Sequence, residues 1–575
     1  MSNSFITAMK SEQIDSENES ATTWNGAKSY ATTSTVTQNG ALVNYLFKAL
    51  RSAPKNELEK LWVAAKSESH PAASLLAFFT RDRFKGKGER LPFQCMLQYE
   101  ARHGSSETII RWLPLISYFG YPKDLLCLGT TKDETNTTVK RVETEMLTFY
   151  CSVLLEDKRR SENSKQVTTF AKFAPTENGE HDKKFGFVGK MCKILTNLLN
   201  RSKENPFTKK EYRTMLASLR SYCQIPERLM CLNLWHTIKF SAVPSRCMHN
   251  NKKAFEKHAP QEWAEYVKQL ESGETKVNSN LFPHDLAAKA LHGGGFDQVA
   301  ESQWKTMQAK AKKEFAEFDM SGILVMADTS ASMKEKISKD STVQCMDASI
   351  GLGLFFAELL PEPWKDCVLT FTSVPRFHKA QGTNLAEKLR SLKEGSVENT
   401  NFQAALDLIL NTAVENNVAR SDMPSILLAI SDMQFDRCGP NDTNFSLMKK
   451  KFASTLAPDG LPYSMPSIVF WNVQGKTTDY PAQADSDSVA MLSGFSPGIL
   501  RLVFTGELNP VQVVRRAISD PRYDVIVQQE EVNWKKFLYA DFDKRGRDGS
   551  EKNKNSEEEE EEVGELTKKV KVVEL

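Results

Sequence analysis

Five side chains that carry oxygen stand out in the C-terminal half of the chain, because three of them share one short motif and two occupy related positions. They are Asp328, Ser330, Ser332, Thr400 and Asp432. Carboxylate and hydroxyl oxygens are the ligands that hard cations prefer, and Mg²⁺ takes them in an octahedron at about 2.0–2.1 Å. The five residues therefore predict a site for Mg²⁺ or Mn²⁺, provided that the fold brings them together.

Short apolar runs recur through the same part of the chain and predict the strands that position these residues. The runs cover 323–327, 367–371, 426–430 and 468–471. Runs of this length are typical of strands buried on both faces of a parallel sheet. Helix-like stretches lie between them, including an amphipathic one at 402–413. Strands alternating with helices predict a Rossmann-like, doubly wound α/β domain, which we place at residues 318–528.

Two of the apolar runs lead into the aspartates of the predicted site. Asp328 directly follows the first run, Asp432 lies two residues beyond the third, and Thr400 stands just before the amphipathic stretch. Ligands of open α/β sheets bind at the carboxyl ends of the strands, where both aspartates are expected. The D-x-S-x-S motif by itself is equally typical of a helix N-cap, because Asp and Ser are favoured there. The strand context, Thr400 and Asp432 favour the metal site.

A second set of motifs matches those of serine hydrolases. Residues 494–498 read G-x-S-x-G, and residues 292–295 read HGGG. The residue after the nucleophile must donate its backbone N–H to the oxyanion, and Pro497 has none. The family order also needs a histidine after the serine, yet the last histidine is His378. No other pair of nucleophile and base is evident, so we expect no enzymatic activity.

Residues 39–317 carry apolar side chains at helical rather than strand spacing. Leu42, Tyr45, Leu46 and Leu50, for example, fall on one helical face. We expect an all-helical domain here, of which a solenoid or HEAT-like repeat is one form, although no repeat of fixed period is present. The class is then α followed by α/β. The flanking residues 1–38 and 529–575 are predicted to be mostly disordered, since they cannot bury enough apolar surface.

The overall composition is that of an ordinary soluble protein. The chain has 575 residues, 40% of them hydrophobic, and a formal net charge of +2, which points to no partner class. Its ten cysteines show no zinc-like spacing and are expected to be reduced thiols. No signal peptide and no apolar run of 18 residues is present. These features predict a cytoplasmic or nuclear protein that has no membrane partner.

The helical region carries more Lys and Arg than acidic residues, which predicts an attraction to phosphate. The basic residues of interest are Arg81, Arg83, Lys85, Lys87, Arg90, Lys183, Lys184, Lys190 and Lys193. Phe185, Phe187 and Phe207 lie among the second group and suit base stacking. The competing interpretation is a solvated helix face above core aromatics, and it is slightly favoured because no base-reading module is evident.

Several stretches spread over residues 40–528 form a more specific pattern. They are Arg81-Asp82-Arg83, Gly86-Lys87-Gly88-Glu89-Arg90, Tyr212-Arg213, Leu219-Arg220, Val243-Pro244-Ser245, Asn399-Thr400-Asn401-Phe402-Gln403, Ser431-Asp432-Met433-Gln434-Phe435-Asp436, Ile468-Val469-Phe470-Trp471-Asn472 and Leu492-Ser493-Gly494-Phe495-Ser496. With the D-x-S-x-S unit, they resemble a little-characterised plant, fungal and viral family that joins a helical region to a von Willebrand factor A-like domain. The domain order is also similar to that of the Ro autoantigen, in which a helical-repeat ring (TROVE) binds RNA and closes on an A domain.

The resemblance implies a metal-ion-dependent adhesion site (MIDAS) rather than a catalytic one. In such sites an acidic side chain of a protein partner fills an open position on the metal. By the same resemblance, Asp328 anchors the ion directly or through water, Ser330 and Ser332 ligate it directly, and Thr400 and Asp432 exchange between direct and water-mediated contact. Two departures are Ala331, where the family often has Gly, and a longer segment from Lys334 to Thr342.

Two functions follow from these features and stay open at this point. The first is a non-enzymatic scaffold that captures an acidic residue of a protein partner through Mg²⁺ or Mn²⁺. The alternative is an RNA-binding component of a ribonucleoprotein that uses the basic helical region.

Overall fold

A computed structural model describes residues 20–22, 28–30, 40–293, 295–371, 374–393, 401–434, 444–476, 487–504, 508–528, 532–535 and 538–539. Helices make up the first part of the chain and a six-stranded sheet lies in the second, which confirms the predicted α and α/β order. The tails predicted to be disordered lie mostly outside the described residues. Within the first of them, β1 (Ser20–Thr22) and β2 (Lys28–Tyr30) pair as antiparallel strands.

The sheet of the C-terminal region is mixed and has the strand order β5-β4-β3-β6-β7-β8. Its strands are β3 (Ile323–Asp328), β4 (Cys367–Phe371), β5 (Arg376–Lys379), β6 (Ile426–Ser431), β7 (Ser467–Asn472) and β8 (Val489–Ser493). All neighbours pair in parallel except β5, which is antiparallel to β4. The four apolar runs became β3, β4, β6 and β7, as predicted, whereas β5 and β8 were not anticipated.

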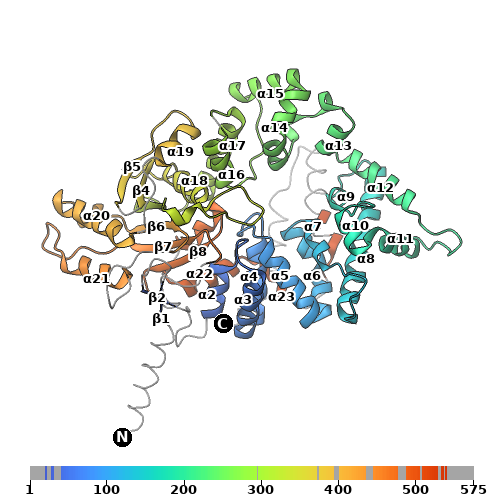
Figure 1. Ribbon diagram of the computed structural model, residues 1–575, viewed down its shortest axis with the longest axis horizontal. Helices are drawn as coiled ribbons and strands as arrows, with labels where there is room; N and C mark the ends of the chain where they lie inside the picture. Colours follow the sequence, from blue (N-terminus) through green and yellow to red (C-terminus); the bar gives the residue numbers. More distant parts are fainter. Residues whose placement is uncertain are drawn as a thin grey trace, which may run out of the picture.

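Most helices of this region follow the strands and lie over the sheet, whereas the short last one packs on the N-terminal helices (Figure 1). They are α18 (Cys345–Ala357), α19 (Leu385–Lys393), α20 (Phe402–Glu415), α21 (Asn444–Ser454), α22 (Pro510–Ile518) and α23 (Asp524–Val527). Every residue of α18 is buried, because this helix packs on β3, β4 and β6 and is itself covered by a helix of the N-terminal region. The amphipathic stretch at 402–413 lies within α20 and buries its predicted face, including Leu406 and Leu410.

The N-terminal region contains the helices α2 to α17. Their bounds are α2 (Gly40–Lys48), α3 (Lys55–Glu68), α4 (His70–Arg81), α5 (Leu91–His103), α6 (Ser106–Phe119), α7 (Pro122–Leu125), α8 (Thr137–Glu162), α9 (Phe170–Phe173), α10 (Glu180–Phe185), α11 (Phe187–Leu198), α12 (Lys209–Tyr222), α13 (Pro226–Cys231), α14 (Ser245–His258), α15 (Pro260–Ser272), α16 (Pro283–His292) and α17 (Gln298–Glu314). Local signals fix several starts: Asn136, for example, accepts hydrogen bonds from the first amides of α8.

Both ends of the helical region pack against the sheet region. From α2 the helices run through α6 and α8 to α12 and return through α14 and α15 to α16 (Figure 1). At the start of this path, α2 packs on β8 and α22. At its end, α16 packs on α18 so closely that a Cβ added to Gly351 would lie 2.8 Å from the Cβ of Ala287. The helices therefore close into a loop through the α/β region.

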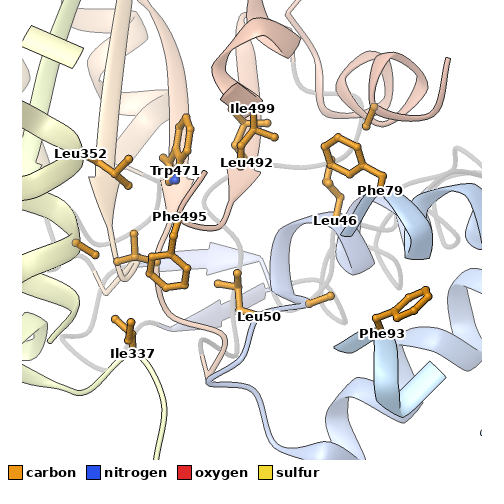
Figure 2. Close-up of a cluster of buried hydrophobic side chains, with 14 of the residues drawn as sticks. Leu46, Leu50, Phe79, Phe93, Ile337, Leu352, Trp471, Leu492, Phe495 and Ile499 are labelled. Carbon is orange, nitrogen blue, oxygen red and sulfur yellow. The ribbon is translucent and has the colours of Figure 1, made fainter. Parts of the chain in front are cut away.

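One hydrophobic core runs through both regions. Figure 2 shows Leu46 and Leu50 of the helical region in the same cluster as Trp471, Leu492 and Phe495 of the sheet region. A smaller, separate core holds the segment around α14 and α15 together, with Phe240, Phe255 and Trp263 at its centre. The boundary near residue 317 is thus a change of secondary structure inside one continuous core.

The described residues after 528 return to the helical region. The ring of Trp534 packs edge-on against Phe149, and the hydroxyl of Tyr539 donates a 2.8 Å hydrogen bond to Asp157 of α8. The nine cysteines among the described residues are all free thiols, as expected. In the same part of the chain, no helix has the length and apolar character needed to cross a membrane.

Candidate metal centre

The two aspartates of the predicted site lie beside each other at the carboxyl edge of the sheet. Asp328 is the last residue of β3, and Asp432 follows the last residue of β6. The strands are parallel neighbours, with Ala327 opposite Ile430. The chain proceeds from β3 to β4 on one side and later returns to β6 on the other, so the aspartates stand where the strand order reverses. Open α/β sheets bind their ligands at this switch point.

Residues 328–335, which contain the D-x-S-x-S motif, are called the metal loop. Its side chains are linked to one another by hydrogen bonds. The amide of Ser330 donates a 2.9 Å bond to Asp328 Oδ1, and the hydroxyls of Ser330 and Ser332 are 3.1 Å apart. Ser332 also hydrogen-bonds the carboxylate of Asp432, which accepts from the amide of Gln434 at 3.1 Å. The structure therefore brings four of the five predicted residues together. The fifth, Thr400, lies outside the described residues.

The geometry of the metal loop differs from that of an N-cap. Ser330 stands at the N-cap position of a short 3-10 helix, η4 (Ala331–Lys334), but its side chain makes no capping hydrogen bond. The next α-helix, α18, begins only at Cys345, where the amide of Gln344 donates a 2.9 Å hydrogen bond to the side chain of Asp347. The longer segment noted in the sequence fills the interval and is pinned by a bridge between Lys336 and Gln344. The hydroxyls of the motif are thus directed at one another and at the carboxylates.

Ser431 also holds the site together, although the sequence did not single it out as a contributor. Ser431, the last residue of β6, donates a 2.6 Å hydrogen bond from its hydroxyl to Asp328 Oδ2. It also accepts the amide of Met433 at 3.0 Å, so it fixes both the carboxylate and the turn that carries Asp432. A polar residue closing an otherwise apolar strand was the available signal, and it lies directly beside Asp432 in the sequence.

The two aspartates of the site are buried beside each other, which disfavours their charged forms. Burial raises the pKa of the Asp328 carboxyl above its ordinary value, and the neighbouring charge of Asp432 raises it further. Burial also raises the pKa of Asp432, with a contribution from Glu335. No lysine or arginine in the described part of the chain pairs with Asp328. Two buried carboxylates so close together are costly to ionise, and their oxygens are of the kind that a divalent cation prefers.

The type of donors also fits a hard cation better than zinc. Among the described residues, no group of three or more His, Cys, Asp and Glu side chains is arranged so that it could hold a metal ion. The set at the metal loop contains two carboxylates and two hydroxyls, and these oxygens suit Mg²⁺ or Mn²⁺ rather than a metal that prefers nitrogen and sulfur.

Four of the five residues in the first basic group are bound to acceptors within the fold. Arg81 is buried and bonded to Asp124, which also accepts from Arg90. Lys87 is fully buried, donates to two backbone carbonyls and to Ser493, and has its pKa lowered to about 7 by burial. Lys85 pairs with Asp520 across to the sheet region. Arg83 is exposed and stacks over Phe84 and Tyr121.

The second basic group is partly exposed, but its aromatics are not available for stacking. Phe187 and Phe207 are buried in the core, and Phe185 packs against Phe187. Lys190 is bound to Glu143 at 2.7 Å. Exposed side chains remain at Lys183, Lys184 and Lys193. The arrangement is that of a solvated helix face above core aromatics.

Comparison with known proteins gives matches without an established activity. Residues 322–563 match a family described as a domain of unknown function (DUF7788), and residues 130–316 match a second domain of unknown function (DUF2828). The chain is 25% identical over 527 residues to an uncharacterised protein, L728, of Acanthamoeba polyphaga mimivirus, covering 86% of this chain and 87% of the relative. These matches agree with the predicted likeness to an uncharacterised family with viral members, and their boundary falls where the helices give way to the sheet.

Proposed function

We propose that the C-terminal region is a von Willebrand factor A-type adhesion domain that binds Mg²⁺ or Mn²⁺ and captures an acidic residue of a protein partner. The observation that carries the proposal is the pairing of Asp328 and Asp432 with the serine hydroxyls of the metal loop at the switch point of the sheet. A bound ion supplies a Lewis-acidic position that a carboxylate from outside can fill. We infer no catalytic role for these residues.

The topology supports the proposal. Numbered within the sheet, the strands have the order 3-2-1-4-5-6, which is that of doubly wound folds that bind ligands at the carboxyl edge. The third strand, β5, is antiparallel and lies at the far edge, so it leaves the switch point unchanged. Elements on both sides of the switch point therefore contribute ligands, as an adhesion site needs.

The charges around the metal loop support an acidic partner. Lys334 is exposed on the loop, Lys336 is exposed directly after it, and Lys476 lies beside it in an ion pair with Glu335. With a divalent ion present, this edge of the sheet carries a local excess of positive charge, which favours approach of a carboxylate. The metal defines the contact, and the lysines add attraction that salt screens.

The adhesion function is tested by retention of partners on the immobilised full-length protein. We expect proteins from a host extract to be retained in Mg²⁺, released by EDTA, and absent from a column carrying Asp328→Ala. Treatment of the extract with ribonuclease should leave this retention unchanged. Retention that resists EDTA and the substitution but is lost with ribonuclease would instead support the RNA-binding alternative.

The raised pKa values predict how metal binding depends on pH. Because both aspartates have folded-state pKa values above those of the unfolded chain, their protonated forms favour the metal-free fold, and this contribution is lost as pH rises through the raised values. Mg²⁺ binds the ionised pair, so it competes with protons at low pH. The increase in melting temperature caused by 10 mM Mg²⁺ should therefore be larger at pH 8 than at pH 5.5. An equal increase at both values, or one retained in Asp328→Ala, would contradict the assignment.

A further inference from the structure

A short segment lies between the metal loop and the helical region and contacts both. We call residues 472–476, which begin at the last residue of β7, the bridge segment. They lie at the same carboxyl edge as Asp328 and Asp432, since β7 is the parallel neighbour of β6 and Ser431 is opposite Asn472. The segment therefore has one side toward the metal loop and another toward the start of the helical region.

Toward the metal loop, the bridge segment holds Glu335 and the start of α18. Gln474 donates from Nε2 to a carboxylate oxygen of Glu335 at 3.2 Å, and Lys476 pairs with the same oxygen at 2.7 Å. The thiol of Cys345 contacts the carbonyl of Val473 at 3.8 Å. Glu335 is the last residue of the metal loop, three residues after Ser332, and its negative charge helps to raise the pKa of Asp432. The bridge segment thus fixes the end of the loop that carries the serine ligands.

Toward the helical region, the bridge segment is held by residues 46–53, which we call the junction loop. Asn472 donates to the carbonyl of Phe47 at 3.3 Å, and the amide of Gly475 donates to the hydroxyl of Ser52 at 2.6 Å. The backbones approach so closely that a Cβ on Gly475 would lie 2.9 Å from the amide nitrogen of Ala53 and 3.0 Å from the Cβ of Leu50. Only glycine allows this approach without displacement.

The junction loop is itself rigidly held. Lys87 donates to the carbonyls of Leu46 and Ala49 and to Ser493 at the end of β8, each at 2.8–2.9 Å. Arg51 is bonded to the buried carboxylate of Glu89 and lies 4.6 Å from the ring centre of Phe495. A displacement of the junction loop would disrupt these buried polar contacts. We therefore expect the loop to keep its position, so that a clash at Gly475 displaces the bridge segment instead.

We infer that Gly475 and Ser52 are positioning residues for the metal centre, through which docking of the helical region sets the affinity of the metal loop for its ion. The inference rests on the proposed metal site and adds its regulation by the helical region. The chain of contacts runs from the junction loop through the bridge segment to Glu335 and the metal loop. Since coupling between two sites is reciprocal, binding of the ion also tightens the docking of the helical region.

The test uses the full-length protein and three variants. Gly475→Ala introduces the clash with the junction loop, Ser52→Ala removes one hydrogen bond to it, and Gly189→Ala is the matched control, because a Cβ at that helical glycine meets nothing within 4 Å. We expect Gly475→Ala to weaken Mg²⁺ binding in calorimetry by about fivefold or more, a typical size for coupling between sites, and Ser52→Ala to weaken it less. Gly189→Ala should bind as the unchanged protein does.

Hydrogen exchange gives a second measurement. If Gly475 and Ser52 had only a structural role, amide exchange in the junction loop would not depend on Mg²⁺. In the unchanged protein, Mg²⁺ should slow amide exchange in residues 46–53, and this effect should be absent in Asp328→Ala. Failure of the unchanged protein to bind Mg²⁺ would overturn the proposed function itself. The positioning role is overturned if the unchanged protein binds Mg²⁺ and both Gly475→Ala and Ser52→Ala bind it with the same affinity. It is also overturned if Mg²⁺ does not change the amide exchange rates of residues 46–53. In either case the proposed metal site remains.

Discussion

Replacing Asp328 by alanine should abolish Mg²⁺ binding while the protein stays folded. The side chain is fully buried at the end of β3 and is fixed by Ser330 and Ser431, so its carboxylate is the best-placed ligand of the metal loop. Loss even of an outer partner of a metal ligand costs about 10–100-fold in affinity, and loss of the ligand itself should exceed 100-fold. Isothermal calorimetry measures the affinity.

The fold should survive because the substitution removes one of two repelling buried carboxylates. Melting in EDTA should show a variant no less stable than the unchanged protein at pH 8, where both aspartates of the unchanged protein carry charge. Asp157→Asn is the matched control, since Asp157 is equally buried but lies within the helical region, bonded to Thr168. It should leave Mg²⁺ affinity unchanged. If the Asp328→Ala protein still bound Mg²⁺ with normal affinity, the metal loop would not be the Mg²⁺ site.

Replacing Lys87 by methionine should destabilise the protein by about 1–3 kcal/mol, the usual cost of leaving buried hydrogen-bond acceptors without a donor. Methionine keeps much of the length of the side chain but leaves the carbonyl of Ala49 and the hydroxyl of Ser493 without the donor that Lys87 supplies, while the carbonyl of Leu46 keeps the hydrogen bond from Ser493. These acceptors are buried at the contact between the two regions, where water cannot replace the ammonium group. Urea unfolding measures the loss of stability.

The same experiment separates a structural lysine from a nucleic-acid contact. Lys183→Met is the matched control, because Lys183 is exposed and its replacement should change the free energy of unfolding by no more than about 0.5 kcal/mol. A Lys87→Met protein with unchanged stability and weakened RNA retention would contradict this account and restore Lys87 to a phosphate-binding surface.

The fold could be predicted where local patterns reflect burial on both faces. The runs at 323–327 and 426–430 became central strands because continuous apolar side chains can be accommodated only inside the sheet. Strand β5 escaped prediction because it is a four-residue edge strand with mostly exposed side chains, including Arg376 and Lys379. Its pairing with β4 comes from tertiary contact and leaves no apolar pattern in the sequence.

The candidate site was predictable for the same reason. Strand ends in a parallel sheet meet at one edge, so Asp328 and Asp432 lie together as the sequence indicated, while their binding of metal stays a prediction. The roles of the basic residues were not predictable. Lys87 is buried by contacts with Leu46 and with Ser493, which is 406 positions away. A partner so distant in the sequence cannot be predicted from a local pattern.

Anomalous scattering from a Mn²⁺-loaded crystal would locate the ion itself. Mn²⁺ substitutes for Mg²⁺ at oxygen sites and can be located by its own signal. The account predicts a peak at the carboxyl edge of the sheet, within about 2.0–2.3 Å of oxygens from the metal loop, among them Ser330 and Ser332, with Asp328 and Asp432 bound directly or through water. A crystal grown in millimolar Mn²⁺ with no peak between β3 and β6 would contradict it.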